Sequence, residues 1–210
     1  ILVWKKAEDF LSKDKYIRPL VKKYGVCKIR PINKKDYFKD LVDAIVQQQL
    51  SLKAAATIFG RITKELGGKV TPERILRKKD ETLRTCGLSY SKIKYLKDLS
   101  SRVSAKGRSS AGRKNGEHLD IYKMDMLPDE KVMEELIKVK GIGRWTAEMF
   151  LMFALARPDI FPADDMGLQN AFKKLIKRNL KPEKMAKFAE RWKPYRTVAS
   201  WYIWKSLENS

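Results

Sequence analysis

Two neighbouring carboxylates, Asp164 and Asp165, are the first residues that could do chemistry. They lie just ahead of an amphipathic stretch at 165–179 that predicts a helix. An ionised carboxylate can stabilise a developing positive charge, and it can orient or deprotonate a water molecule. The dipole at a helix N-terminus keeps such a carboxylate charged. Asp is also a common helix N-cap, so the alternative is that both residues only cap this helix.

A second candidate is the segment VKGIGRWTAEMF at 139–150, which predicts a tight turn followed by a helix. Gly141 and Gly143 can adopt positive φ angles and leave the backbone uncovered. Their N–H groups can then meet a phosphate oxygen, with help from the dipole of the following helix. Thr146 can cap that helix or add a hydroxyl contact. The alternative is a plain glycine C-cap between two helices.

The charge of the chain favours a polyanionic partner. Its 210 residues include 46 Lys and Arg but only 25 Asp and Glu, for a formal net charge of +21. Such an excess favours nucleic acid or an anionic membrane surface. No apolar run reaches the roughly 18 residues that span a bilayer, and we find no secretory signal. One His and two Cys exclude a zinc finger, a disulfide framework and a Cys-ligated iron–sulfur cluster.

Apolar residues at helical spacing predict an all-α fold that positions these candidates. Only 26–32 has a strand-like pattern, and the Gly-, Ser- and Lys-rich segment at about 104–118 predicts a mobile surface loop. The lone His118 at the end of this loop is expected to be solvated. The predicted helical segments are 4–24 with a break near Lys13, 36–50, 52–66, 72–78, 80–86, 89–103, 128–140, 145–157, 165–179, 182–191 and 194–208.

Four segments, taken in order, resemble one known family. The turn at 139–150 looks like the helix-hairpin-helix of the DNA glycosylase superfamily, and FPADDMGLQNAF at 161–172 resembles the Gly/Pro-Asp loop that follows it. AERWKPYRTVASWYIW at 189–204 is similar to the C-terminal helix of the alkylpurine branch, the 3-methyladenine DNA glycosylase II family. DAIVQQQLSLKAAA at 43–56 resembles that branch's segment beside the flipped nucleotide. Each match alone is weak, but four in family order are specific.

This resemblance implies a compact bundle of about ten short helices in two lobes, with the active site in the cleft between them. Residues 1–210 would form a single helix-hairpin-helix glycosylase domain. The implied protein is an intracellular monomer whose partner is double-stranded DNA with alkylated bases, with no membrane contact. It would work in the cytoplasm or nucleoid of a prokaryote, or in the nucleus of a eukaryote.

The implied activity is monofunctional hydrolysis of the N-glycosidic bond of alkylated purines, such as 3-methyladenine or 7-methylguanine, which leaves an abasic site. The reaction passes through an oxocarbenium-like sugar cation. The motif places the catalytic carboxylate at Asp165 and leaves Asp164 as a cap or supporting group. Strand-cleaving relatives carry a Schiff-base lysine two residues after the second glycine. Trp145 occupies that position here, so β-lyase chemistry by that route is excluded.

The resemblance also implies a base pocket formed by Trp145, Met149 and Trp204. An aromatic wall suits a cationic alkylated base through stacking and cation–π attraction, although Trp145 could instead be a core residue. Met149 replaces the tyrosine of some relatives, which leaves base selectivity open. Gln48 or Gln49 is expected to fill the gap in the duplex, and the alternative is a polar helix face.

The remaining implied contacts are with phosphate and a cation. Gly141, Gly143 and Thr146 would bind the DNA backbone, assisted by the basic residues between 173 and 187. No cofactor is required, but relatives hold a monovalent cation, Na⁺ or K⁺, through hairpin carbonyls, and the equivalent carbonyls here belong to Ile137, Val139 and Ile142. Two alternatives stay open: a non-catalytic binder of damaged or structured DNA, and a glycosylase of another base-lesion class.

Overall fold

The computed structural model describes residues 4–104 and 118–207, and within these ranges it is helical without a strand. The loop predicted at about 104–118 therefore lies almost entirely outside the described residues. The strand-like prediction for 26–32 is wrong because the backbone there bonds to side chains instead of a partner strand. The backbone N–H of Cys27 donates to Glu8 at 2.9 Å, and the indole of Trp4 donates to the carbonyl of Ile29 at 2.8 Å.

The chain divides into two units. Unit 1 combines Ile1–Pro31 with Glu148–Ser210, and unit 2 is Ile32–Ala147. Helix α9 (Arg144–Met149) contains the boundary between them. No helix in the described ranges has the length and hydropathy needed to cross a membrane.

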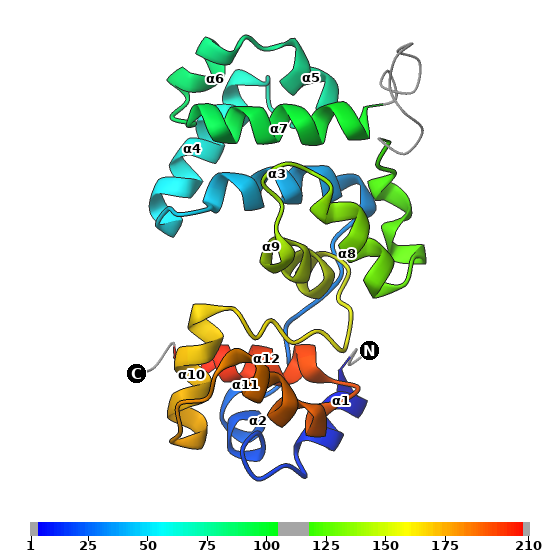
Figure 1. The fold of residues 1–210 in the computed structure, drawn as a ribbon, viewed down its shortest axis with the longest axis vertical. Helices are drawn as coiled ribbons and strands as arrows, with labels where there is room; N and C mark the ends of the chain where they lie inside the picture. Colours follow the sequence, from blue (N-terminus) through cyan, green and yellow to red (C-terminus); the bar gives the residue numbers. More distant parts are fainter. Residues whose placement is uncertain (1–3, 105–117, 208–210) are drawn as a thin grey trace. The chain divides into compact units, whose positions relative to one another are not determined.

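Unit 2 is built around the long helix α7. This helix packs against α3, α5 and α6, which Figure 1 shows in the blue-to-green part of the ribbon. Its residues Ile93, Leu96 and Leu99 are fully buried. As predicted, Thr71 caps the helix that begins at Pro72 by accepting the N–H of Arg74. The helices of the unit are η1 (Lys34–Asp36), α3 (Tyr37–Gln47), α4 (Leu52–Glu65), α5 (Pro72–Arg77), α6 (Asp80–Thr85), α7 (Tyr90–Val103), η3 (Ile121–Met126) and α8 (Asp129–Ile137).

Unit 1 has an aromatic core. Phe161, Phe172, Phe188 and Trp192 pack edge to face or tilted, with ring centroids 5.3–6.3 Å apart. Helix α12 packs against α10, α1 and α2, and the break predicted near Lys13 is confirmed because the first helix ends at Leu11. The elements are α1 (Lys5–Leu11), α2 (Arg18–Tyr24), the π-helix η4 (Phe150–Ala154), α10 (Met166–Ile176), α11 (Pro182–Ala189), η5 (Glu190–Trp192) and α12 (Arg196–Lys205).

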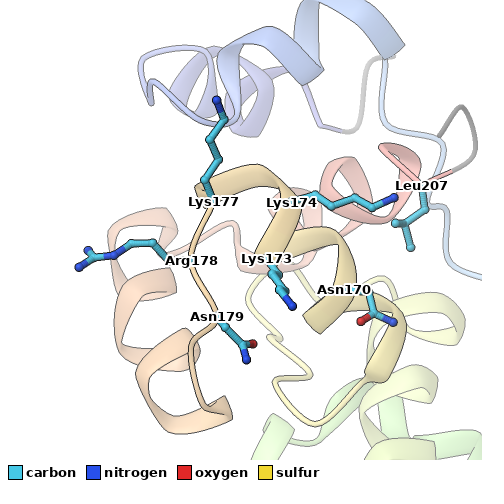
Figure 2. A pocket seen from close by; sticks show the side chains of 7 residues that line it. All are labelled: Asn170, Lys173, Lys174, Lys177, Arg178, Asn179 and Leu207. Atoms are coloured by element: carbon cyan, nitrogen blue, oxygen red, sulfur yellow. The ribbon is translucent and has the colours of Figure 1, made fainter.

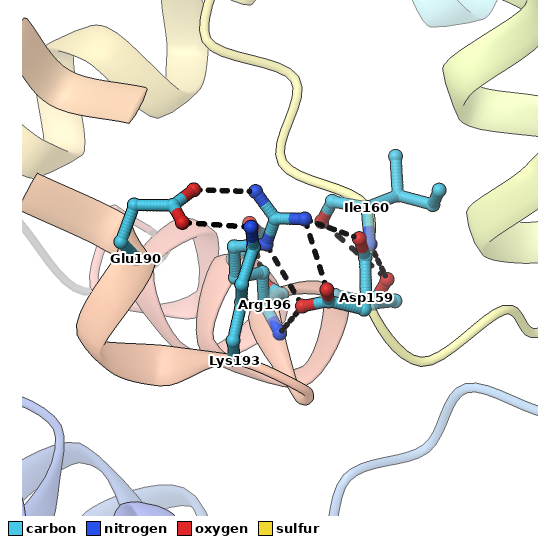
Figure 3. Close-up of polar contacts among 7 residues, drawn as sticks. Asp159, Ile160, Glu190, Lys193 and Arg196 are labelled. Carbon is cyan, nitrogen blue, oxygen red and sulfur yellow. Dashed lines mark hydrogen bonds and ion pairs between the residues drawn. The ribbon is translucent and has the colours of Figure 1, made fainter. Parts of the chain in front are cut away.

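The first turn of α12 binds the segment that leads into the candidate catalytic loop. The Nε and Nη2 atoms of Arg196 donate to the two carboxylate oxygens of Asp159 at 2.8 and 2.9 Å, and Nη1 donates to Glu190 at 3.2 Å (Figure 3). Beside this pair, the hydroxyl of Thr197 accepts the backbone N–H of Ile160 at 2.9 Å. A bidentate pair has fixed geometry. It therefore holds the chain at 159–160 against α12, immediately before the loop that carries the two aspartates.

Candidate active site

Asp165 is held by two hydrogen bonds at the start of α10. Its Oδ1 atom accepts the backbone N–H of Leu168 at 2.6 Å and the indole N–H of Trp204 at 2.9 Å. A Cβ atom at Gly167 would lie 3.1 Å from the same oxygen, tighter than most real contacts, so glycine leaves room for this arrangement. The side chain is half-buried. A carboxylate with two fixed donors on one oxygen has a defined direction, as a catalytic group needs.

Of the two roles expected for Asp164, helix cap or supporting group, the first is wrong. Asp165 is the N-cap of α10, with φ −70° and ψ 120°, whereas Asp164 is exposed. The reason is register. Because α10 begins at Met166, Asp165 directly precedes the helix, and its side chain accepts the N–H of Leu168 three residues later. The residue that matches the catalytic motif is thus also the helix cap.

Trp204 lies between Asp165 and Phe153, a residue that no sequence motif indicates. Its ring centroid is 6.0 Å from that of Phe153, at an interplanar angle of 36°. Trp204 is half-buried and Phe153 is 38% exposed, whereas Trp201 and Tyr202 on the same helix are buried in the core. Unit 1 therefore presents an accessible aromatic pair next to the candidate catalytic carboxylate.

Helix α9 carries the other two predicted pocket residues. Trp145 is 42% exposed and is therefore not a core residue, while Met149 is half-buried. Positions 145 and 149 lie one turn apart on the same face of α9. Phe153 continues this four-residue spacing, and that repeat is the sequence signal that could have identified it.

The hairpin turn (residues 138–143) connects α8 to α9. Backbone N–H groups of Val139 and Ile142 donate to Leu136 and Val139 at 3.0 Å, and the side chains of Val139 and Ile142 are buried. Gly141 has φ +81°, a conformation that favours glycine. The buried side chains of Val139 and Ile142 therefore hold the hairpin turn in place, and Gly141 allows its backbone conformation.

Of the two glycines that can adopt positive φ, Gly143 does not use this freedom. Only Gly141 adopts such an angle, and a Cβ atom at Gly143 would meet nothing within 4 Å. Gly143 is exposed at the start of α9, so packing within the protein does not require a glycine at this position. Thr146 is only 3% exposed, which makes its hydroxyl less suited to phosphate than the Gly143 backbone.

A short loop, residues 48–51, joins α3 to α4 and carries the two candidate wedge residues. The side-chain amide of Gln48 donates to the carbonyl of Gly141 at 2.8 Å, so this side chain is bound to the hairpin turn. Gln49 is exposed and has φ +57°, a left-handed conformation that non-glycine residues seldom adopt. Such strained positions cluster at functional sites. Of the two residues, Gln49 has the side chain that can reach outward.

Comparison with known proteins shows which family this chain belongs to. Residues 42–195 match the HhH-GPD superfamily of base excision DNA repair proteins. The chain belongs to this superfamily. It is 38% identical over 207 residues to DNA-3-methyladenine glycosylase 1 of Schizosaccharomyces pombe, a match that covers 96% of this chain and 86% of that one. The family predicted from the sequence is thus confirmed.

Two solved structures of the HhH-GPD superfamily match nearly the whole fold. One is the Schizosaccharomyces pombe 3-methyladenine DNA glycosylase in complex with abasic DNA, with a TM-score of 0.80, 35% identity and 97% coverage of both chains. The other is a DNA-3-methyladenine glycosidase from Bacillus halodurans, with a TM-score of 0.81, 34% identity and coverage of 96% of this chain and 88% of that one. These matches assign the chain to the 3-methyladenine DNA glycosylase branch of the superfamily and confirm the all-α prediction.

This HhH-GPD chain also carries a basic surface at the end of α10, formed by Lys173, Lys174, Lys177 and Arg178. Together with Asn170, Asn179 and Leu207, they line an open pocket of about 680 Å³. Figure 2 shows the four cationic side chains spreading away from one another. Within the described part of the chain, no carboxylate forms an ion pair with any of them. The surface thus offers several separate positive charges to a partner.

Proposed function

We propose that this member of the 3-methyladenine DNA glycosylase branch removes alkylated purines, such as 3-methyladenine and 7-methylguanine, from double-stranded DNA and leaves an abasic site. The observation that carries the proposal is the fixed carboxylate of Asp165 beside the accessible ring of Trp204. The activity for which these relatives are named, removal of 3-methyladenine, supports the substrate class. The protein acts as a monomer, alongside the genome, in the nucleoid or cytoplasm of a prokaryote or the nucleus of a eukaryote.

Asp165 assists the bond cleavage. N-alkylation at N3 or N7 gives the purine a positive charge, so the base departs as a neutral leaving group without protonation by an acid. The electron pair of the breaking C–N bond goes to the base, and positive charge develops on the sugar. The Asp165 carboxylate stabilises this cation and accepts a proton from the water that attacks the anomeric carbon.

The exposed aromatic residues bind the flipped base. In unit 1, Trp204 stacks on the cationic ring and Phe153 supports it through their ring contact. On α9, Trp145 offers an exposed indole to a base and Met149 offers a polarisable contact. Stacking on a base is worth roughly 1–3 kcal/mol by alanine substitution. A cationic base gains more from an electron-rich indole than a neutral base does. This difference favours an alkylated purine over its normal counterpart.

Backbone N–H groups of the hairpin turn and cationic side chains at the end of α10 bind the DNA. Gly143 offers its backbone N–H to a phosphate, since the residue is exposed and the space beside its Cα is open. The cations at the end of α10 attract further phosphates without reading sequence. Gln49 enters the space vacated by the flipped base. None of these contacts distinguishes one base from another, as a search for rare lesions requires.

The carbonyls of Ile137, Val139 and Ile142 fit a monovalent cation in their chemistry. Carbonyl oxygens are hard donors of the kind that Na⁺ and K⁺ accept, and the buried Val139 and Ile142 side chains hold the turn. The Val139 carbonyl accepts the N–H of Ile142 and retains a second lone pair. A bound cation would add positive charge beside the phosphate-binding N–H groups. The hydrolysis itself requires no cofactor.

One assay tests the proposed function. The protein is incubated with duplex DNA that carries methylated bases, and the released bases are identified by chromatography. We expect 3-methyladenine and 7-methylguanine. Asp165→Asn should remove most release while duplex binding stays within a few-fold, because the loss falls on transition-state charge.

Asp164→Asn is the matched control, since it changes the adjacent exposed carboxylate. Release of no base by the wild-type protein, with tight binding to the same duplex, would support the non-catalytic alternative. Full turnover of Asp165→Asn would show that another group carries the reaction.

A further inference from the structure

One face of α7 contacts both loops to which the proposed function assigns DNA contacts. Lys92, Tyr95 and Asp98 follow one another at intervals of three residues, so their side chains lie on neighbouring turns of the same side. All three belong to unit 2, as do the hairpin turn and the 48–51 loop. The inference rests on the proposed function, because it concerns how those two loops are held.

Lys92 fixes the end of α3. Its Nζ atom donates to the carbonyls of Val46 and Gln48 at 2.7 Å each. The last carbonyls of a helix have no intrahelical donor, so an ammonium group there satisfies them and complements the negative end of the dipole. The first residue of the 48–51 loop is therefore bound directly to α7.

Tyr95 fixes the position of the hairpin turn by its shape. A Cβ atom at Gly141 would lie 2.2 Å from Cδ2 and 2.3 Å from Cγ of the Tyr95 ring. No real Cβ makes such a contact, so only a glycine backbone can approach the ring this closely. Gly141 is thus required twice, once for φ +81° and once for the approach to Tyr95.

Asp98 and Gln48 complete the connection. The Oδ2 atom of Asp98 accepts the backbone N–H of Lys140 at 2.9 Å and the Nε–H of Arg102 at 2.9 Å. The Gln48 side chain donates to the Gly141 carbonyl at 2.8 Å, which joins the two loops to each other. Each loop is therefore bonded to α7 and also to the other loop.

We propose that Lys92, Tyr95 and Asp98 form a positioning face, which sets the hairpin turn and the 48–51 loop at a fixed separation. When the hairpin turn binds a phosphate, Gln49 is then aligned with the space that the flipped base leaves in the duplex. Binding to undamaged duplex needs the hairpin turn, whereas capture of a flipped base needs both loops in register. The three side chains act through these loops and not on the substrate.

The first test separates capture from binding. Lys92→Met keeps the length of the side chain but removes its donors. We expect the saturating excision rate to fall about tenfold, which corresponds to a small loss of alignment, while affinity for undamaged duplex stays within about twofold. The fluorescence of 2-aminopurine placed beside the lesion should report less base flipping. Lys92→Arg, which keeps the donors, should recover most of the rate.

Lys94→Met is the matched control, because it removes one exposed lysine from the same helix. Thermal melts give the folded fraction for each variant, so that rates are compared per folded molecule. A Lys92→Met protein that excises and flips at the wild-type rate would overturn the positioning role, and so would a Lys94→Met protein with the same loss.

The second test uses the contact between Tyr95 and Gly141. Gly141→Ala should weaken duplex binding and lower the melting temperature. Adding Tyr95→Ala should recover part of both, because it removes the ring that the new methyl group strikes. A double variant no better than Gly141→Ala alone would show that the ring does not set the turn. The melting temperature keeps this test decisive even where Gly141→Ala binds too weakly to measure.

The two proposals fail in different ways. Release of alkylated bases by the wild-type protein, together with unaltered positioning variants, would overturn the positioning face alone. Release of no base would overturn the proposed function, and the recovery of duplex affinity and melting temperature by Tyr95→Ala would still test the positioning face.

Discussion

At the scale of single residues, the indole of Trp204 donates a hydrogen bond to Asp165 in addition to its ring contact with Phe153. Trp204→Phe keeps an aromatic ring near Phe153 but removes the N–H donor. We expect single-turnover excision to slow about tenfold or more, because a less well oriented carboxylate stabilises the sugar cation poorly. Undamaged duplex should bind as before. Single-turnover release from a methylated duplex measures the first quantity, and fluorescence anisotropy measures the second.

Trp201→Phe serves as the comparison, since it also removes an indole N–H from α12 but lies in the core. Its excision rate per folded molecule should match the wild type. Equal rates for Trp204→Phe and the wild type would mean that Asp165 is oriented without the indole N–H of Trp204.

The identity of residue 145 gives a second prediction at this scale. Schiff-base chemistry needs an amine, and Trp145 has none. Borohydride added during the reaction should therefore trap no covalent complex of protein and DNA on a denaturing gel. A strand-cleaving glycosylase treated in parallel provides the positive control, and a trapped band with this protein would contradict the monofunctional assignment.

Sequence alone could place Asp165 at the start of a helix, because residue type and apolar periodicity agree there, while its catalytic role stays a prediction. It could not predict the partner of that carboxylate, since Trp204 lies 39 residues away in the chain and reaches it only through the packing of α12 on α10. Lys92, Tyr95 and Asp98 were missed for the same reason. Their roles depend on contacts between segments, and no local pattern records those contacts.

At the scale of elements, helix α3 carries a carboxyl group whose ionisation opposes folding. Burial raises the pKa of Asp40 to about 6, and the nearby Asp43 adds to the increase. A group with a raised pKa in the folded state binds protons more tightly there than in the unfolded chain. Its folded state therefore loses stability as pH rises from the ordinary carboxyl range through about 6.

Asp40→Asn should remove this effect. We expect the variant to be about 1–2 kcal/mol more stable than the wild type at neutral pH, a value reduced from the full shift because the side chain is half-buried. Its stability should also change less between pH 5 and neutrality. Urea unfolding at several pH values measures both. Asp43→Asn removes the smaller cause of the Asp40 shift together with the less strongly raised pKa of Asp43 itself. It should give a weaker change, and an equal or larger change would contradict the dominance of the buried Asp40.

Helices with clear apolar periodicity were predictable, and those without it were not. The segments that became α3, α4 and α7 were predicted within a few residues, because each buries one apolar face. The 3₁₀-helix η3 was missed, since its 121–126 stretch is too short to show a period. The π-helix η4 was read as ordinary helix, because the shift from i+4 to i+5 bonding leaves no mark on the apolar pattern.

At the scale of the whole molecule, the net charge of +21 should make the affinity for DNA strongly dependent on salt concentration. Each phosphate contact made by a cation releases condensed counterions, so the affinity falls as salt rises. Replacing Lys173 and Lys177 with Gln should reduce the slope of log affinity against log salt by about 2 for undamaged duplex. The excision rate at saturating protein should not change. Anisotropy titrations over a range of salt concentrations give the slope.

A pair of exposed lysines on a different helix, Lys22 and Lys23 at the end of α2, provides the comparison. Their replacement by Gln changes the net charge equally. If both pairs reduce the slope by the same amount, the effect belongs to the overall field and not to the end of α10.

The division of the chain has a consequence for its synthesis on the ribosome. Unit 2 is continuous, so all of its helices emerge in one run, but unit 1 takes α1 and α2 from the start and the rest from 148 onward. The core partners of Trp4, Leu11 and Ile17 that lie beyond residue 147 have therefore not been synthesised while Ile32–Ala147 is being made. Chains grow at about 5–20 residues per second and fold largely as units. Nascent α1 and α2 thus remain without most of their core partners for several seconds, until the residues from 148 onward have been made.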